Sequence, residues 1–354
     1  MIETFATKLT EKLQIEVPIM SAGMAGVAGP DLVAAVSNAG GIGTIGAIGM
    51  SPQELQKCIR DTKKLLLPGK PMGVDLLLPK LGKGARATNA DYTNGQLEAL
   101  VDVMVDEQIA LFVCAVGVPP KWVVEKLHAN NIVVMNMVGA PKHVRHCINA
   151  GVDIICAQGT EAGGHTGDVS TFVLLPQVVD LCREAGILVV GAGGIYDGRG
   201  VVAALALGAD GVWLGTRFIM TKEANVQPSS QLAIGKSRST DTIRTEIYTG
   251  RPARTLRNEY NLDWERGRIA EKYELLNKGV IPWFEDIKQG KLPRNSPSPI
   301  PKGYRNYKNQ EINTDVSIVP VGQACGPLSV IEPVQVVITN IMFEVKQTLD
   351  RLKR

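Results

Sequence analysis

Residues 153–168 have the sequence Asp153-Ile-Ile-Cys-Ala-Gln158-Gly-Thr-Glu-Ala-Gly-Gly-His165-Thr-Gly-Asp168. The apolar first part predicts a buried strand, and the apolar-periodic run 171–185 after the loop predicts a helix. A glycine-rich loop therefore carries His165 and two acids at the carboxyl end of a strand, where parallel α/β proteins place their chemistry. The loop glycines let a flat ligand approach the backbone closely.

The same strand–loop–helix unit recurs up to about residue 220. Short apolar runs predict eight strands at 17–24, 41–49, 71–78, 110–116, 132–138, 153–158, 188–193 and 211–215. Helices are predicted at 30–38, 52–66, 95–107, 120–129, 141–150, 171–185 and 198–207. Eight strands, each followed by a helix or a helix-length segment, predict an α/β fold, the (β/α)8 TIM barrel. A doubly wound open sheet is the competing fold, but no Gly-x-Gly-x-x-Gly fingerprint follows the first strand.

The pattern changes after the eighth strand. Residues 222–322 lose the strand–helix alternation and contain a charged helical run, 262–278, and a Pro/Ser-rich stretch, 293–301. We expect a smaller, mainly helical second domain here, on the substrate side. Residues 328–352 predict a helix that returns to pack on the barrel. Residues 1–221 and 323–354 would then form the barrel domain.

Composition limits the classes of function. The chain has 354 residues and a net charge of +3 without a basic block, which argues against a nucleic-acid partner. No run approaches the roughly 18 apolar residues of a membrane helix. The first 16 residues lack the apolar core of a signal peptide. The six cysteines are scattered without zinc-site spacing, so we expect reduced thiols, a cytoplasmic location and no metal centre.

Two loops at the ends of the last two strands favour a phosphate site. Gly193 and Gly194 follow the seventh strand, and Gly215 and Thr216 follow the eighth. Barrels often bind phosphate there through backbone amides. Small or amide- and carboxylate-bearing residues at other strand ends suit a flat heterocycle; these are Ser21, Ala22, Gly23, Met24, Asp75 and Gln158. Flavin mononucleotide (FMN) fits this pattern, and a phosphorylated sugar or nucleotide substrate fits the phosphate site equally well.

His165 is the candidate acid or base because it titrates near neutral pH. Glu161 and Asp168 are candidates to orient its ring, with capping of the following helix as the alternative role. Arg251, Arg254 and Arg257 could meet an anionic substrate, although nearby acids favour ion pairs within the second domain. Cys325 is either a loop nucleophile or a small buried residue.

Six motifs together resemble the nitronate monooxygenase family. They are Pro18-Ile-Met-Ser-Ala-Gly-Met24, Gln158-Gly-Thr-Glu-Ala-Gly-Gly-His165, Gly191-Ala-Gly-Gly-Ile195, Gly215-Thr-Arg-Phe218, Thr249-Gly-Arg-Pro-Ala-Arg254 and Gly322-Gln-Ala-Cys-Gly326. The resemblance implies an FMN-bound barrel in which His165 is the catalytic base. It implies flavin contacts from Gln158, Gly163 and the adjacent Gly164, and a phosphate end at Gly194 and at Trp213, Leu214, Gly215 and Thr216. An asparagine or glutamine of the family is replaced here by Asp75.

The resemblance implies oxidation of alkyl nitronates, such as propionate 3-nitronate, by O2 to a carbonyl compound and nitrite. The same motifs also resemble flavin-dependent enoyl-acyl-carrier-protein reductases and NADH:quinone reductases. An NAD(P)H-dependent FMN reductase of enoyl thioesters or quinones is therefore the alternative, and a non-catalytic phosphate-binding module is a third. We expect a small-molecule substrate and O2 as partners, with a homodimer as a candidate assembly.

Overall fold

The structure is a computed structural model that describes residues 5–291 and 319–353. The eight predicted strands form one parallel sheet in the order β1-β9-β8-β6-β5-β4-β3-β2. They are β1 (Ile19–Ser21), β2 (Gly43–Gly46), β3 (Met72–Leu77), β4 (Leu111–Ala115), β5 (Val133–Val138), β6 (Ile154–Gln158), β8 (Leu188–Ala192) and β9 (Gly211–Leu214). Met20 pairs with Ile42, and the Ser21 amide donates to the Ile42 carbonyl at 2.9 Å, so the sheet closes into the predicted barrel.

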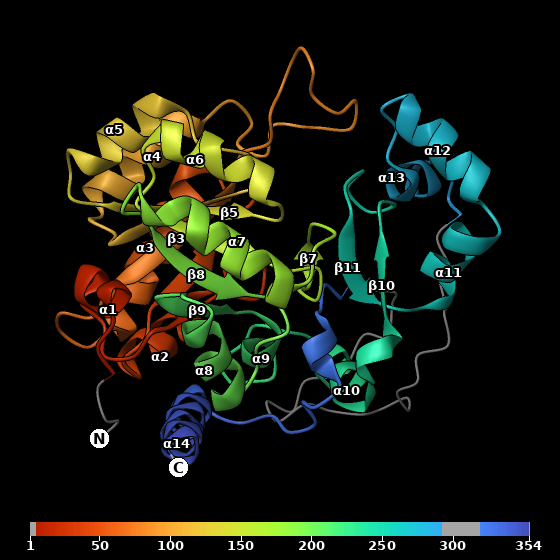
Figure 1. Cartoon of the computed structure of the whole chain (residues 1–354). Coiled ribbons are helices and arrows are strands. Elements are labelled where there is room, and N and C mark those ends of the chain that lie inside the picture. The colour runs from red at the N-terminus through yellow and green to blue at the C-terminus, as the bar shows by residue number, and fades with distance from the viewer. Residues whose placement is uncertain (1–4, 292–318, 354) are drawn as a thin grey trace.

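Helices surround this barrel (Figure 1). They are α2 (Pro30–Asn38), α3 (Pro52–Leu65), α4 (Leu97–Asp106), α5 (Lys121–His128), η1 (Pro141–His143) with α6 (Val144–Ala150), α7 (Thr171–Arg183) and α8 (Gly198–Ala206). The start of α3 shows how the sequence sets their bounds. Ser51 caps the Glu54 amide, the Glu54 side chain accepts from the Ser51 amide, and Pro52 occupies the first turn.

The barrel interior is a separate apolar cluster that includes Met20, Leu111, Met135 and Trp213. Leu9 and Leu13 of α1 (Lys8–Leu13) belong to the same cluster and cover the amino-terminal end of the strands. The carboxyl end of the barrel is therefore the end available to a ligand. No helix in the described ranges is both long and apolar enough to cross a membrane.

The chain after β9 contains strands that the sequence analysis did not predict. Its elements are α9 (Thr216–Ile219), α10 (Pro228–Lys236), η2 (Ser239–Asp241), β10 (Thr242–Thr245), β11 (Ala253–Leu256), α11 (Glu259–Arg266), α12 (Ile269–Asn277), α13 (Pro282–Lys288), η3 (Gln323–Cys325) and α14 (Val334–Leu352). Strands β10 and β11 form an antiparallel sheet with β7 (Gly164–His165), which lies between them and the barrel in Figure 1. The second domain expected at 222–322 and its boundaries stay a prediction, and its mainly helical described part includes this unpredicted hairpin.

Two helix predictions also differ from the structure. The helical run expected at 262–278 is two helices, because the backbone leaves helical geometry at Arg268. The last helix begins only after Pro333 rather than at residue 328, and it packs on the barrel helices α8 and α2. Its Glu344 accepts a hydrogen bond from the Gly198 amide at 2.8 Å. The Pro/Ser-rich stretch 293–301 lies outside the described residues.

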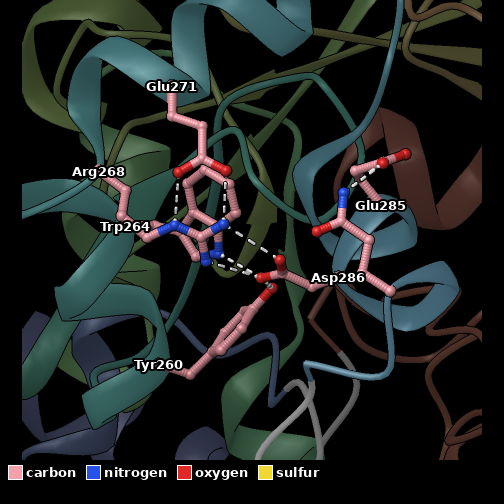
Figure 2. Close-up of polar contacts among 7 residues, drawn as sticks. Tyr260, Trp264, Arg268, Glu271, Glu285 and Asp286 are labelled. Atoms are coloured by element: carbon pink, nitrogen blue, oxygen red, sulfur yellow. Dashed lines mark hydrogen bonds and ion pairs between the residues drawn. The ribbon is translucent and has the colours of Figure 1, made fainter.

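A buried carboxylate organises the helices α11 to α13 (Figure 2). Asp286 accepts hydrogen bonds from the Tyr260 hydroxyl at 2.9 Å, the Trp264 indole at 3.0 Å and the Arg268 guanidinium at 2.9 Å. The Arg268 guanidinium also lies 3.5 Å above the Trp264 ring centre. Burial by itself raises the pKa of Asp286, but the Arg268 and Tyr260 bonds outweigh it and hold the pKa below its usual value.

We predict that Asp286→Asn lowers the free energy of unfolding by about 2 kcal/mol, because it removes the charged acceptor of three hydrogen bonds while Arg268 keeps Glu271 as its ion-pair partner. Since the folded pKa is lowered, this contribution is complete above about pH 4 and is lost as the pH falls through the folded value. Urea unfolding followed by tryptophan fluorescence measures it. Glu285→Gln, which changes the adjacent and partly exposed acid, is the matched control. Equal stability of the two variants at pH 7 would contradict the prediction.

Candidate functional site

A cavity of about 910 Å³ lies over the carboxyl ends of the barrel strands. This volume is within the range of small-molecule and cofactor sites. Most residues that the sequence predicts for the site line it: Ala22, Gly23, Met24, Asp75, Gln158, Gly163, Gly164, His165, Gly193, Gly194, Trp213, Gly215 and Thr216. The hairpin between β10 and β11 adds a second wall, which includes Thr249 and Arg251.

Two predicted contacts, Ser21 and Leu214, do not belong to the lining. Leu214 packs in the core between the strands and the helices, whereas its neighbour Trp213 faces the barrel interior. Ser21 is fully buried, and its hydroxyl oxygen accepts a hydrogen bond from the Thr44 amide at 3.3 Å. Ser21 and Leu214 do not line the cavity, although their neighbours do, because successive side chains of a strand point to opposite faces of the sheet.

His165 is held at the cavity by strand pairing. In β7, His165 pairs with Ala253 of β11 and Gly164 pairs with Arg254. The Gln158 side-chain amide donates to the His165 carbonyl at 2.5 Å, so the end of β6 also fixes the loop. The His165 Nε2 atom lies 3.0 Å from the Thr249 hydroxyl oxygen. The group that orients the ring is therefore Thr249.

The hypothesis that Glu161 and Asp168 orient the His165 ring is wrong. Glu161 accepts hydrogen bonds from the Thr171 amide and hydroxyl, each at 3.0 Å, and so caps the start of α7. Asp168 is largely exposed and forms an ion pair with Arg244 of β10. Capping, the alternative role, is thus confirmed for Glu161, whereas Asp168 ties the loop to the hairpin.

Burial controls the charge of the site. Burial and, to a smaller extent, the positive charge of Arg251 together lower the pKa of His165 to about 4. The imidazole is therefore neutral at neutral pH. Burial also lowers the pKa of Arg251, with a contribution from Arg86. Since an arginine stays protonated in proteins, Arg251 places a fixed positive charge beside a neutral histidine.

The three arginines 251, 254 and 257 do not form the expected ion pairs within the described parts of the chain. Arg254 donates to the Thr160 carbonyl at 2.9 Å and to the Thr242 hydroxyl at 3.0 Å. Arg257 donates to the Thr240 carbonyl. The Arg251 guanidinium has no hydrogen-bond or ion-pair partner among residues 5–291 and 319–353, while Arg86 pairs with Glu246 at 3.1 Å. Arg251 is thus the uncompensated cation of this wall.

The loops after β8 and β9 meet the chain near its carboxyl end. Gly193, Gly194 and Gly215 line the cavity without side chains, and the Thr216 hydroxyl oxygen accepts a hydrogen bond from the Gly322 amide at 2.9 Å. Thr216 keeps its hydroxyl proton for a ligand. In the described ranges, no cluster of three or more histidine, cysteine or acidic side chains is arranged to hold a metal.

A family model described as nitronate monooxygenase matches residues 6–342. A "Probable nitronate monooxygenase" of Staphylococcus saprophyticus is 36% identical over 290 residues, which covers 72% of this chain and 79% of the relative. The (3aS,4S,5R,7aS)-5-hydroxy-7a-methyl-1-oxo-octahydro-1H-indene-4-carboxyl-CoA dehydrogenase of Rhodococcus jostii is 38% identical over 258 residues, covering 73% and 67%.

Two solved structures have the same fold over nearly their whole length. FabK from Thermotoga maritima has a TM-score of 0.76 at 32% sequence identity, and the match covers 99% of each chain. Nitroalkane oxidase from Streptomyces ansochromogenes has a TM-score of 0.75 at 27% identity, covering 97% of this chain and 99% of that one. The barrel fold and the assignment as an oxidoreductase are thereby confirmed.

We predict that Arg251→Met raises the pKa of His165 above about 4, because it removes the positive charge that opposes protonation. The pKa stays below the ordinary 6.5, since burial is the larger cause. Titration of isotope-labelled histidine by NMR measures it, with His165→Asn to assign the signal. Arg183→Met, on the exposed face of α7, is the control. An unchanged titration in Arg251→Met would show that the two groups do not interact.

Proposed function

The chain belongs to the nitronate monooxygenase family, a family of flavin-dependent oxidoreductases, and we propose that it uses FMN to oxidise alkyl nitronates with O2 to a carbonyl compound and nitrite. The observation that carries the proposal is the neutral His165 beside the uncompensated Arg251 at the mouth of the barrel. A neutral imidazole accepts a proton from a nitroalkane, and a fixed cation stabilises the nitronate anion that forms.

The residues of the cavity fit FMN. Glycines without side chains line the ends of β8 and β9, and Asp75, whose carboxyl Oδ1 atom is buried without a partner, lines the same cavity. In the proposal, Gly193, Gly194, Gly215 and Thr216 hold the phosphate, and residues 22–24 with Gln158 and Gly163 flank the ring. The cofactor supplies the electron transfer to O2, and the protein supplies orientation and charge.

The contact with Thr249 leaves one ring nitrogen of His165 open to a substrate. Nε2 lies 3.0 Å from the Thr249 hydroxyl oxygen, which also lies 3.3 Å from the Arg251 carbonyl oxygen. The other ring nitrogen, Nδ1, has no partner among the described residues, and in the proposal it is the atom that accepts the substrate proton. Because β7 is paired to β11, this nitrogen is held in place before substrate binds. We also infer that the segment after β9 is the substrate-side domain, since its hairpin supplies Thr249 and Arg251.

A second candidate is an NAD(P)H-dependent FMN reductase of enoyl thioesters or quinones. The likeness to a carboxyl-CoA dehydrogenase and to FabK favours it. Anaerobic mixing of the purified protein with NADH, NADPH or propionate 3-nitronate, followed by flavin absorbance, separates the two. Bleaching by the nitronate alone supports the proposal, whereas bleaching by a nicotinamide without response to nitronate supports the reductase.

We predict that His165→Asn lowers turnover of a neutral nitroalkane by about 100-fold or more, which is the range of general base catalysis. Turnover of the preformed nitronate should fall much less, because its α-proton is already gone. Oxygen consumption with both substrates measures the ratio. His146→Asn, at an exposed position of α6, should leave both rates unchanged. An equal loss with both substrates would exclude His165 as the base.

A further inference from the structure

Among the described acidic side chains that line the cavity, that of Asp75 differs because it has no hydrogen bond or ion pair, whereas Glu161 and Asp168 have partners. Asp75 lies in β3 between Gly46 of β2 and Val113 of β4, and its backbone carbonyl accepts from the Ala47 amide at 3.0 Å. The residue is only 7% exposed and lines the cavity. Its backbone is thus fully used in the sheet, while its carboxyl group is free for a ligand.

The Asp75 carboxyl group has no partner in the protein. Its Oδ1 atom is buried without a hydrogen bond, and no described residue forms an ion pair or hydrogen bond with either oxygen. An ionised carboxylate in such a place costs several kcal/mol, so the group takes up a proton instead. Burial accordingly raises the pKa of Asp75 well above its ordinary value.

The neighbouring titratable groups do not supply a compensating charge. They are the thiols of Cys114 on β4 and Cys156 on β6, and burial raises the pKa of both. Both thiols are therefore neutral at neutral pH. An uncharged Asp75 is the state that this part of the barrel stabilises.

The loop after β1 limits the orientation of the Asp75 side chain. A Cβ atom added at Gly23 would lie 2.3 Å from the Asp75 Cβ atom and 2.7 Å from Oδ2. Only glycine permits this approach, and the close contact limits the rotamers of the carboxyl group. Gly23 also lines the cavity, so the acid and the loop after β1 form one surface.

We propose that Asp75 keeps its proton at neutral pH and donates it in a hydrogen bond to an acceptor atom of the bound flavin ring. The inference rests on the proposed FMN cofactor and goes beyond it, because it assigns the proton state and the role of Asp75. A donor at the ring stabilises the additional negative charge of the reduced flavin. Asp75 is therefore a residue that sets the affinity for reduced relative to oxidised cofactor, separately from the base His165.

Infrared difference spectroscopy of the flavin-loaded protein, oxidised minus reduced, tests the proposal without any turnover. We expect the C=O band of a protonated carboxyl group at pH 7 that shifts on flavin reduction. The band should be lost in Asp75→Asn and kept in Glu161→Gln, which changes the cavity acid that Thr171 already satisfies. Absence of the band in the wild type, its persistence in Asp75→Asn, or its insensitivity to reduction would each overturn the proposal.

The reduction potential is an independent readout. Asp75→Leu removes the donor, so we expect about tenfold weaker binding of reduced relative to oxidised flavin, which is a fall of about 30 mV for a two-electron couple. Asp75→Asn keeps an N–H donor and should lie nearer to the wild type. An unchanged potential in Asp75→Leu would contradict the role. These measurements need bound flavin and not nitronate, so failure of the proposed substrate leaves them valid. A purified protein that binds no flavin overturns both proposals and is recognised by absorbance beforehand.

Discussion

The pairing of β7 with β11 is the interaction on which the site depends. It consists of two residue pairs, yet it joins a loop of the barrel to a hairpin about ninety residues later in the sequence. The Arg254 side chain reinforces it through the Thr160 carbonyl, and the Gln158 amide fixes the other side of the same loop. His165 and Arg251 come from two segments that are distant in the sequence, and the Thr166 amide joins these segments further by donating to the Pro252 carbonyl at 3.2 Å. With this pairing, base and cation share one wall of the cavity.

Burial away from water shifts the pKa values of two groups in the cavity in opposite directions. It lowers the pKa of the basic His165 and raises the pKa of the acidic Asp75, so both are neutral at neutral pH. Arg251 stays positively charged in spite of its partial burial, because a guanidinium group keeps its proton in proteins. The cavity thus combines a neutral base, a neutral acid and Arg251, a partly buried cation without a side-chain partner in the described residues. This combination favours a ligand that is anionic or becomes anionic during the reaction, which is the property of a nitronate.

The sequence predicted the barrel because its strands are short apolar runs and its helices have a long apolar period, with glycine and proline between them. Helix α2 even begins and ends at the predicted residues. Strands β7 and β10 lacked any such signal, since they have two and four residues and no run of apolar side chains. The position of His165 was predictable from its place after β6. The contact of His165 with Thr249 and the ion pair of Asp168 with Arg244 were not predictable, because Thr249 and Arg244 belong to the unpredicted β10–β11 hairpin.

The histidine loop needs glycine for a second reason, close backbone packing, which the sequence alone did not show. A Cβ atom at Gly163 would lie 2.7 Å from the Val321 carbonyl carbon, and one at Gly322 would lie 2.6 Å from the Glu161 carbonyl oxygen. Two backbones distant in sequence therefore pack directly on each other, and the Gln323 amide donates to the Glu161 carbonyl at 2.8 Å. Burial raises the pKa of the neighbouring Cys325, whose thiol faces the Arg238 carbonyl, so it is a packed residue and not an activated nucleophile. Segment 322–326 thus packs on the histidine loop and also hydrogen-bonds to Thr216. It thereby fixes the position of the histidine loop relative to the loop after β9.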